Sequence, residues 1–199
     1  MFSRTALAAP VVVAGAAGVV GNDVIVVSEA YFAQAVRTLE KNTAVSMEPI
    51  AKEALKTIVS RLLFESMVIG EMKALKIDRT LRPTAVASWQ RVKQREKSWR
   101  QVLTRYAKTE NDAIDSIWNF MEVEAFVEKK VETFVPIITD AEVERYYQQN
   151  ITRLGADSLE KQRAGIRTML QNVRIEKSFE EWIRFLREKY AVVNLLGAG

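Results

Sequence analysis

The sequence contains neither cysteine nor histidine among its 199 residues. The lack of cysteine excludes a disulfide framework and thiolate chemistry. The lack of histidine excludes Ser-His-Asp and Cys-His catalysis, removes the commonest general base and, with cysteine also absent, removes ordinary zinc sites. We therefore expect a protein that is not an enzyme, with no catalytic residues, no cofactor and no metal ion.

Long uncharged hydrophobic runs are also missing, apart from the N-terminal stretch, so no other segment reaches the roughly 18 residues of a membrane span. The composition, 48% hydrophobic and 27% charged, is that of a globular protein rather than a disordered one. The length is sufficient for one domain with a substantial core. We expect a single domain over residues 9–199 and no membrane span.

The N-terminal residues MFSRTALAA resemble the tail of a secretion signal. Arg4 precedes small apolar residues, and Ala6-Leu7-Ala8 matches an A-x-A cleavage site. The apolar part before that site is short, and the alternative is that residues 5–20 form the hydrophobic region of the signal. Both interpretations predict export across the inner membrane. In the first interpretation, residues 1–8 are a remnant of the signal. A chain without cysteine tolerates an oxidising compartment.

Residues 50–77, IAKEALKTIVSRLLFESMVIGEMKALKI, are predicted to form a long central helix, because apolar residues recur at three- and four-residue steps. Pro49 is expected in its first turn and Ser46 as its N-cap. At 1.5 Å per residue the helix would extend about 40 Å. Its apolar stripe requires cover along the whole length, so most of its residues are expected in the core.

Strands are predicted at both ends of the chain. Residues 11–27, VVVAGAAGVVGNDVIVV, carry two β-branched runs around Gly21-Asn22-Asp23, which favours a hairpin. Residues 191–196, AVVNLL, read as one short strand. Because an isolated hairpin is only marginally stable, we expect the C-terminal strand to pair with it and bring the chain ends together.

The remaining segments are predicted to be helical, which makes the fold mostly α, with about six helices and a small sheet. A helix is expected after Ser28 as its cap, and another over residues 84–108. The next would start at Asn111 or Asp112 and end before Pro136. Further starts are predicted at the capping box of Thr139 and Glu142, and at Asp157 with Glu160, for a helix that reaches about Tyr190.

Charge is unevenly distributed along the chain, although the net charge is only +4. Residues 79–108 contain nine Lys/Arg and one acidic residue, whereas residues 110–144 contain ten Asp/Glu and two lysines. We expect these adjacent segments of opposite sign to face each other inside the fold.

Four stretches in this order resemble the SurA-type periplasmic chaperone family over most of residues 16–196. These are VVGNDVIVVSEAYF, IVSRLLFESMVIGEMKALKI, ITDAEVERYYQQN and FEEWIRFLREKYAVVNLL. Two features depart from the family pattern: Ala74-Leu75-Lys76-Ile77 lacks a glycine, and a parvulin prolyl-isomerase domain is absent after the third stretch. Since no histidine is present either, the resemblance implies a chaperone core without isomerase activity.

The resemblance implies a periplasmic holdase that binds unfolded exported proteins, outer-membrane protein precursors in particular. Such a protein needs an apolar groove with adaptable side chains, for which methionine and aromatic residues are suited. For each candidate the alternative is ordinary core packing. Exchange of strands or helices between two copies would give a homodimer, which the sequence leaves open. The peptide-binding candidates are Phe64, Met67, Met72, Trp89, Trp99, Phe120 and Met121.

An alternative function is binding of nucleic acid or an anionic surface through residues 84–108. Basic side chains would neutralise phosphates, and Trp89 and Trp99 would stack on bases. Both tryptophans, however, are spaced like a buried stripe, so we expect a solvated basic face and no nucleic-acid partner. A carboxylate enzyme built on Glu122, Glu124, Glu128 and Glu132 has little support, because di-iron bundles need histidine. The basic residues concerned are Arg91, Lys93, Arg95, Lys97, Arg100 and Arg105.

Overall fold

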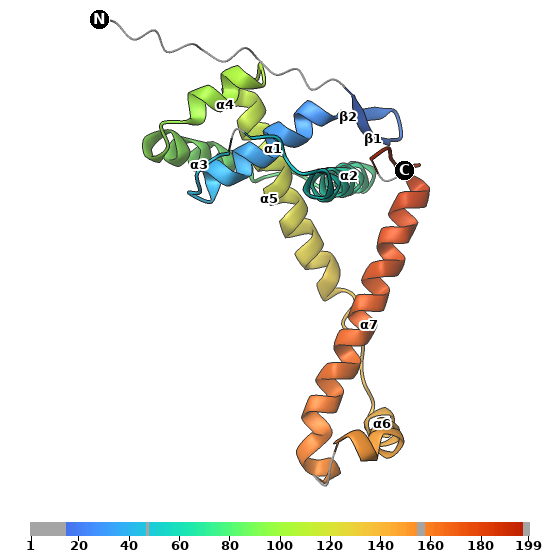
Figure 1. Cartoon of the computed structure of the whole chain (residues 1–199). Helices are drawn as coiled ribbons and strands as arrows, with labels where there is room; N and C mark the ends of the chain where they lie inside the picture. Colours follow the sequence, from blue (N-terminus) through green and yellow to red (C-terminus); the bar gives the residue numbers. More distant parts are fainter. Residues whose placement is uncertain (1–14, 47, 155–157, 197–199) are drawn as a thin grey trace, which may run out of the picture. The chain divides into compact units, whose positions relative to one another are not determined.

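The computed structural model describes residues 15–46, 48–154 and 158–196. These residues form a mostly α fold with a small antiparallel sheet made by the N-terminal hairpin and the C-terminal strand, as predicted (Figure 1). The described part contains seven helices, against about six predicted. The elements are β1 (Ala16–Val20), β2 (Asp23–Val26), α1 (Val27–Glu40), α2 (Lys52–Ala74), α3 (Arg82–Arg95), α4 (Trp99–Arg105), α5 (Glu110–Glu132), α6 (Asp140–Leu154), α7 (Leu159–Lys189) and β3 (Val193–Asn194).

The chain groups into two compact units, where the sequence predicted one domain. Unit 1 comprises Met1–Phe126 and Leu186–Gly199, and unit 2 comprises Val127–Phe185. Unit 1 therefore contains the sheet, α1 to α4, most of α5 and the last turn of α7. Unit 2 contains the end of α5, α6 and most of α7.

The sheet of unit 1 has the strand order β2-β1-β3. Gly21 and Asn22 form the turn between β1 and β2, and Gly21 takes a φ of 57°, a left-handed conformation that glycine adopts without strain. β3 pairs antiparallel with β1 at Gly18 and Val19. The predicted meeting of the chain ends is confirmed for the described residues, while the part of the predicted hairpin before residue 15 lies outside them.

The C-terminal segment forms hydrogen bonds with α2 as well as pairing with the sheet. Glu71, which is buried, accepts hydrogen bonds from Lys189 Nζ at 2.6 Å and from the Tyr190 hydroxyl at 2.9 Å. Burial and the Glu71 carboxylate together raise the pKa of Tyr190. The Tyr190 carbonyl in turn accepts from the Gly21 amide at 2.7 Å. The last turn of α7 is thus attached to both α2 and the hairpin.

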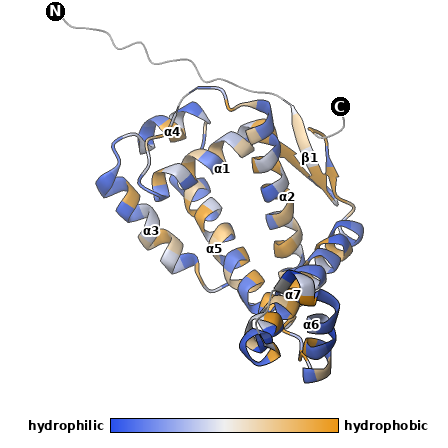
Figure 2. Cartoon of the chain, turned by 60° about the horizontal axis from the view of Figure 1, so that its bottom comes forward, coloured by the Kyte–Doolittle hydropathy of each residue, from blue (hydrophilic) through white to orange (hydrophobic). Residues whose placement is uncertain are grey.

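A large hydrophobic cluster of unit 1 lies between α1, α3, α4 and the first half of α5, and α2 and the sheet bury further core residues, such as Val59, Met67 and Ala17. Hydrophobic and hydrophilic residues alternate around α1, α2 and α5 (Figure 2), which is typical of helices with one buried face. Trp89 is the largest fully buried side chain of the described residues. The main cluster consists of Phe32, Ala35, Val36, Leu39, Ala85, Trp89, Val92, Val102, Leu103, Ala113, Ile114 and Ile117.

Ser46 and Ser28, the N-caps predicted for the first two helices, do not cap them. α2 begins at Lys52, and the Ser46 hydroxyl accepts instead from the Glu48 amide in the preceding loop, at 3.2 Å. Ser28 lies inside α1, which begins one residue earlier. The Glu29 carboxylate accepts from the Val26 amide at 3.0 Å, so an acidic side chain performs the capping role.

The single helix predicted over residues 84–108 is divided into α3 and α4, which accounts for the extra helix. Glu96 takes an extended conformation at the break, with φ −109° and ψ 114°. The break lets Val102 of α4 join Val92 of α3 in one cluster, which a straight helix would keep apart. Downstream, the predicted caps Asn111 and Asp112 lie inside α5, and Thr109 forms a capping box with Asp112.

Unit 2 is an α6–α7 helix pair with its own small core of Ile138, Val143 and Ile166. The capping box predicted at the start of α6 is confirmed: Glu142 accepts from the Thr139 amide at 2.9 Å, and the Glu142 amide donates to the Thr139 hydroxyl at 3.3 Å. α7 continues through Gly165 without a break. Its predicted cap, Asp157, lies outside the described residues. Arg163 and Arg167 pair with Asp140, and Arg174 pairs with Glu142.

The predicted pairing of oppositely charged segments is confirmed within unit 1. Arg82 at the start of α3 forms an ion pair with Asp115 of α5, and Lys93 pairs with Glu110 at 2.7 Å. The Leu81 amide, just before α3, donates to buried Glu122 of α5 at 2.7 Å. The acidic helix α5 therefore holds the basic helix α3 at both of its ends. Among the described helices, none is long and apolar enough to span a membrane.

Candidate polypeptide-binding groove

Three of the seven residues predicted to contact a client are core residues. Met67 and Met72 are each 2% exposed, and Trp89 is fully buried. Their spacing on α2 and α3 places them on the faces that other elements cover. In this structure they offer no surface to a ligand, so core packing accounts for all three.

The other four candidates, Phe64, Trp99, Phe120 and Met121, are half-buried. Trp99 packs edge-on against Trp89, with ring centroids 6.0 Å apart, and Met121 packs against the main cluster. The Arg37 guanidinium lies 3.8 Å from the centre of the Phe120 ring. None of these four residues is among the described residues that line the two hollows considered next.

A groove in unit 1 lies between α1, the loop that joins α1 to α2, and the first turns of α2; we call it the α1–α2 groove. Its volume is about 310 Å³, at the lower end of the range of ligand pockets. It is open to solvent on one side. Its aliphatic lining comes from two helices and the loop, and consists of Ala35, Ala44, Val45, Pro49, Ile50, Ala54 and Ile58.

Polar groups are interspersed with this lining. Gln34 uses its amide oxygen to accept from both terminal nitrogens of Arg61, each at 3.4 Å. That contact orients the side-chain amide so that its NH₂ group is the part left to donate. The Thr38 hydroxyl donates to the Gln34 carbonyl at 2.9 Å, along α1. The groove thus combines an apolar floor with a fixed hydrogen-bond donor.

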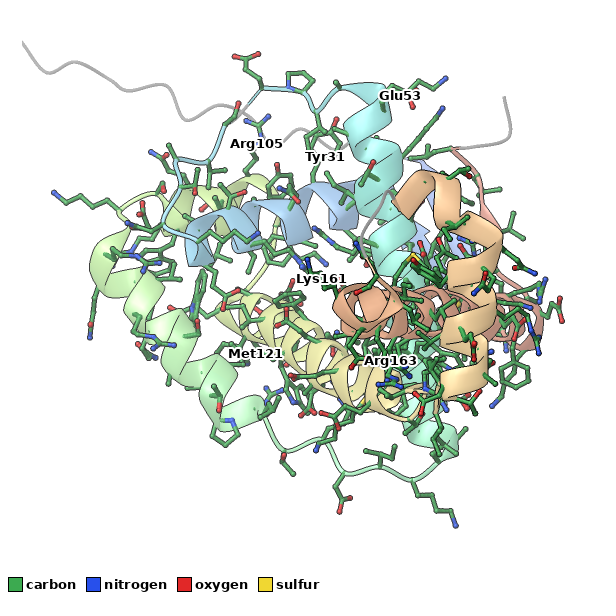
Figure 3. The ribbon with its side chains drawn as sticks, turned by 90° about the horizontal axis from the view of Figure 1, so that it is seen from below. Tyr31, Glu53, Arg105, Met121, Lys161 and Arg163 are labelled. Carbon is green, nitrogen blue, oxygen red and sulfur yellow. The ribbon has the colours of Figure 1, made fainter. Side chains whose placement is uncertain are left out.

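The rings of Tyr31 and Tyr106 also line the groove. Burial raises the pKa of the Tyr106 hydroxyl, and the Arg105 side chain, which donates a hydrogen bond to it, opposes that rise. Figure 3 shows Tyr31 and Arg105 on the side of α1 that faces the α1–α2 loop. One part of the groove therefore carries two phenol rings, while Arg105 is not among the described residues that line it.

Behind the groove, α1 and α2 are joined by a buried ion pair. Glu65 of α2 is 7% exposed and pairs with Arg37 of α1 and, at 3.5 Å, with Arg61. Burial raises the pKa of Glu65, and the two guanidinium groups oppose this rise. Since Arg61 also holds Gln34, this network fixes the wall of the groove rather than forming a separate site.

A second hollow, of about 280 Å³, lies against β2, α1, α2 and α5. Four carboxylates line it: Glu29, Glu65, Asp112 and Asp115. Each already accepts a hydrogen bond from the protein itself. These carboxylates take part in hydrogen bonds within the fold, so their presence in the hollow gives no reason to assign a ligand.

The basic residues of α3 and α4 are partly engaged inside the molecule. Lys93 pairs with Glu110, and Arg95 donates to the carbonyls of Leu39 and Glu40 at 3.0 and 2.9 Å. Arg100 lies over Trp99 at 4.6 Å. With Trp89 buried and Trp99 packed on it, neither indole ring presents a free face of the kind on which bases stack.

Metal ligation is not supported by the acidic residues of α5. Glu122 accepts from the Leu81 amide and, at 2.8 Å, from Trp118 Nε1. Within the described ranges, no group of three or more potential ligands is placed to hold a metal ion.

The sequence analysis did not identify the groove, because its lining is dispersed over four segments: α1, the α1–α2 loop, α2 and the end of α4. Ala35 and Ala54 are small residues on helices, and Val45 and Pro49 lie in a loop with no periodicity. A usable signal is the pair Ser46 and Pro49, which the sequence analysis assigned to a helix start but which is also typical of an irregular connection between two helices.

No family model, no curated protein and no solved structure matches this chain in the three comparisons made with known proteins.

Proposed function

We propose that this protein is a chaperone of the SurA type that binds unfolded segments of exported proteins, outer-membrane precursors among them, in the periplasm. The α1–α2 groove is the binding site in this proposal. The single observation that carries it is the lining of that groove, in which apolar and aromatic surface surrounds an oriented amide donor. No catalytic step is part of the function.

The lining suits an extended polypeptide because such a chain has both kinds of group. Its side chains gain from contact with Val45, Ile50 and Ile58, at roughly 25 cal/mol per Å² of apolar surface removed from water. Its backbone carbonyls need donors, which Gln34 and the tyrosine hydroxyls supply. A groove of about 310 Å³ accommodates a short stretch of chain rather than a folded domain.

The fold adds support through the resemblance noted in the sequence. The hairpin, the central helix α2, the capped start of α6 and the closing α7–β3 segment follow one another as the family pattern implies. Export and a periplasmic location are part of the same proposal, as is a homodimer formed by strand or helix exchange. Light scattering on the purified chain tests the homodimer.

The test is suppression of aggregation of an unfolded β-barrel protein by the purified chain, at low and at high salt. Suppression at both salt concentrations supports binding in an apolar groove. Suppression that disappears steeply with salt would indicate phosphate-like, electrostatic contacts through α3 and α4 instead. Absence of suppression at either concentration would contradict the chaperone function.

A matched pair of substitutions locates the site. Ala54 is exposed on α2 and lines the groove, so Ala54→Trp fills it without disturbing the core. Ala87 is exposed on α3 and lies outside the described lining of both hollows, so Ala87→Trp adds the same ring elsewhere. We expect Ala54→Trp to weaken suppression and Ala87→Trp to leave it unchanged; equal effects would move the site away from the groove.

A further inference from the structure

The chain that precedes β1 leaves the sheet at the point where α1 begins. β1 and β2 are antiparallel, with Ala16 paired to Val26, so the start of β1 lies beside the end of β2. The amide of Val27, the first residue of α1, donates to the Gly15 carbonyl at 3.0 Å. A Cβ atom added at Gly15 would lie 3.8 Å from Val27 Cγ2. Followed backward from Gly15, the chain therefore starts from the first turn of α1.

This first turn leads directly to the α1–α2 groove. The residues of α1 in the lining of the groove are Tyr31, Gln34, Ala35 and Thr38. They follow Val27 by four, seven, eight and eleven positions, the spacing of residues that share one face of a helix. At 1.5 Å per residue, the groove begins about 6 Å beyond Val27 and extends along α1 to roughly 17 Å.

Residues 9–14, which we call the N-terminal segment, have the length and the composition to fill this groove. Their sequence is APVVVA, and they lie outside the described residues. Six extended residues span roughly 20 Å, which is enough to reach from Gly15 to the far end of the lining of α1. Three consecutive valines suit a floor formed by Ile50 and Ile58, and backbone carbonyls can accept from the Gln34 side-chain amide.

We propose that the N-terminal segment binds in the α1–α2 groove and occupies it until a client displaces it. This inference rests on the proposed function, since it gives the client site an occupant from the chain itself. A tethered segment has a local concentration in the mM range, so weak contacts are sufficient to fill the groove. The same weakness lets a longer apolar client compete with it.

The charge of the lining agrees with this occupant. Glu48 is the only charged residue among the described residues of the lining, and the N-terminal segment has no charged side chain for it to repel. If the chain is cut after Ala8, as the A-x-A pattern predicts, the new amino group of Ala9 is opposite in sign to Glu48. Because Glu48 is exposed, solvent and salt keep this attraction small. Apolar contact of the valines is therefore the main contribution.

Cross-linking of the full chain tests the position of the segment, because the chain has no cysteine of its own. Val12→Cys is combined with Ala54→Cys, since Ala54 is exposed on α2 and lines the groove. The matched control combines Val12→Cys with Lys52→Cys. Lys52 is also exposed in the first turn of α2, is not in the described lining, and points away from Ala54 because the two residues are two positions apart.

The readout is the rate of disulfide formation under mild oxidation, followed by mass spectrometry. We expect position 12 to join position 54 about tenfold faster than position 52, because a disulfide requires Cα atoms within about 7 Å.

Client binding measures the competition. The probe is a fluorescent ten-residue peptide of alternating valine and threonine, and its binding to the full chain is followed by fluorescence anisotropy. Val12→Asp places a charge against the apolar floor and should release the segment. We expect about tenfold tighter peptide binding if the segment otherwise fills the groove about nine times in ten. Thr5→Asp adds the same charge outside residues 9–14 and should leave peptide binding unchanged.

The outcomes separate the two proposals. Faster cross-linking at position 54, together with tighter peptide binding by Val12→Asp, supports the inference. Equal rates at positions 54 and 52, or peptide binding that Val12→Asp leaves unchanged, would overturn it while the chaperone function stands. If the intact chain and Val12→Asp both fail to suppress aggregation, the proposed function is lost, and the cross-linking rates alone decide whether the segment lies in the groove.

Discussion

The ring of Tyr190 lies against the backbone of α2 at Gly70. A Cβ atom added at Gly70 would approach Tyr190 Cε1 to 2.8 Å, closer than real Cβ contacts. Glycine at this position therefore creates the space for the ring, and the neighbouring Glu71 then accepts the hydrogen bond of the Tyr190 hydroxyl. Two consecutive residues near the C-terminal end of α2 thus position the end of α7 and, through it, β3.

Substitution of Gly70 by alanine tests this contact. The helix propensity of alanine favours the variant by up to about 1 kcal/mol, whereas overpacking against the ring opposes it by about 1–3 kcal/mol. We expect Gly70→Ala to lower the free energy of unfolding measured with denaturant. Gly165→Ala is the matched control, because nothing lies within 4 Å of a Cβ there; it should stabilise by about 0.5–1 kcal/mol. An unchanged or higher stability for Gly70→Ala would mean that the ring is not held on α2.

Deletion of residues 191–196 tests the joining of the chain ends. The deletion removes β3, its pairing with β1, and the hydrogen bond from the Leu195 amide to the Ala17 carbonyl. The β1–β2 hairpin would remain as a two-stranded sheet, which is only marginally stable alone. We expect a lower melting temperature by circular dichroism. If the truncated chain melted at the temperature of the intact one, the pairing would contribute nothing.

Glu122 connects α5 to the start of α3 through one oxygen atom, Oε1, which accepts from both the Leu81 amide and Trp118 Nε1. Glu122→Leu leaves two half-buried donors without this acceptor, at a cost of up to about 1–3 kcal/mol each. We expect a clear drop in the free energy of unfolding. Glu122→Gln keeps an oxygen at the same place and should retain much of the stability. Equal losses in the two variants would point to the charge rather than to the hydrogen bonds.

The start of α6 should show a pH dependence at acidic pH. The Thr139 amide, Arg174 and the Thr139 hydroxyl lower the pKa of Glu142 to about 2. Because the pKa is lower in the folded than in the unfolded chain, the stabilisation is fully present above about pH 4.5 and is lost as the pH falls toward 2. Titration of the Glu142 carboxyl by NMR measures it directly. Arg174→Gln should move the pKa upward, while a value near 4.5 in the intact protein would contradict the capping geometry.

The sequence predicted much of the architecture from local patterns. The three- and four-residue spacing on α2 identified the helix, and the capping box of Thr139 and Glu142 is present as expected. Helix starts failed where the cap was a less common one, as with Glu29 at α1. The break between α3 and α4 was missed because residues 96–98 contain no glycine or proline.

The candidate site was less accessible to sequence reasoning. Met67, Met72 and Trp89 are residue types that suit a client-binding surface, but all three lie in the core. The α1–α2 groove, in contrast, is lined in part by Ala35, Ala54 and other residues that carry no signal of their own.

The sequence by itself determined which face of each helix is apolar. It also determined that the N-terminal hairpin and the C-terminal strand pair, since neither is stable alone. Periodicity records these features because they depend on residues close together along the chain. Only the tertiary structure decided which apolar faces are covered and where a groove stays open, since both depend on segments that meet across long separations. It also placed Tyr106 with Tyr31 in the lining of one groove, although the two residues are 75 positions apart and no local pattern connects them.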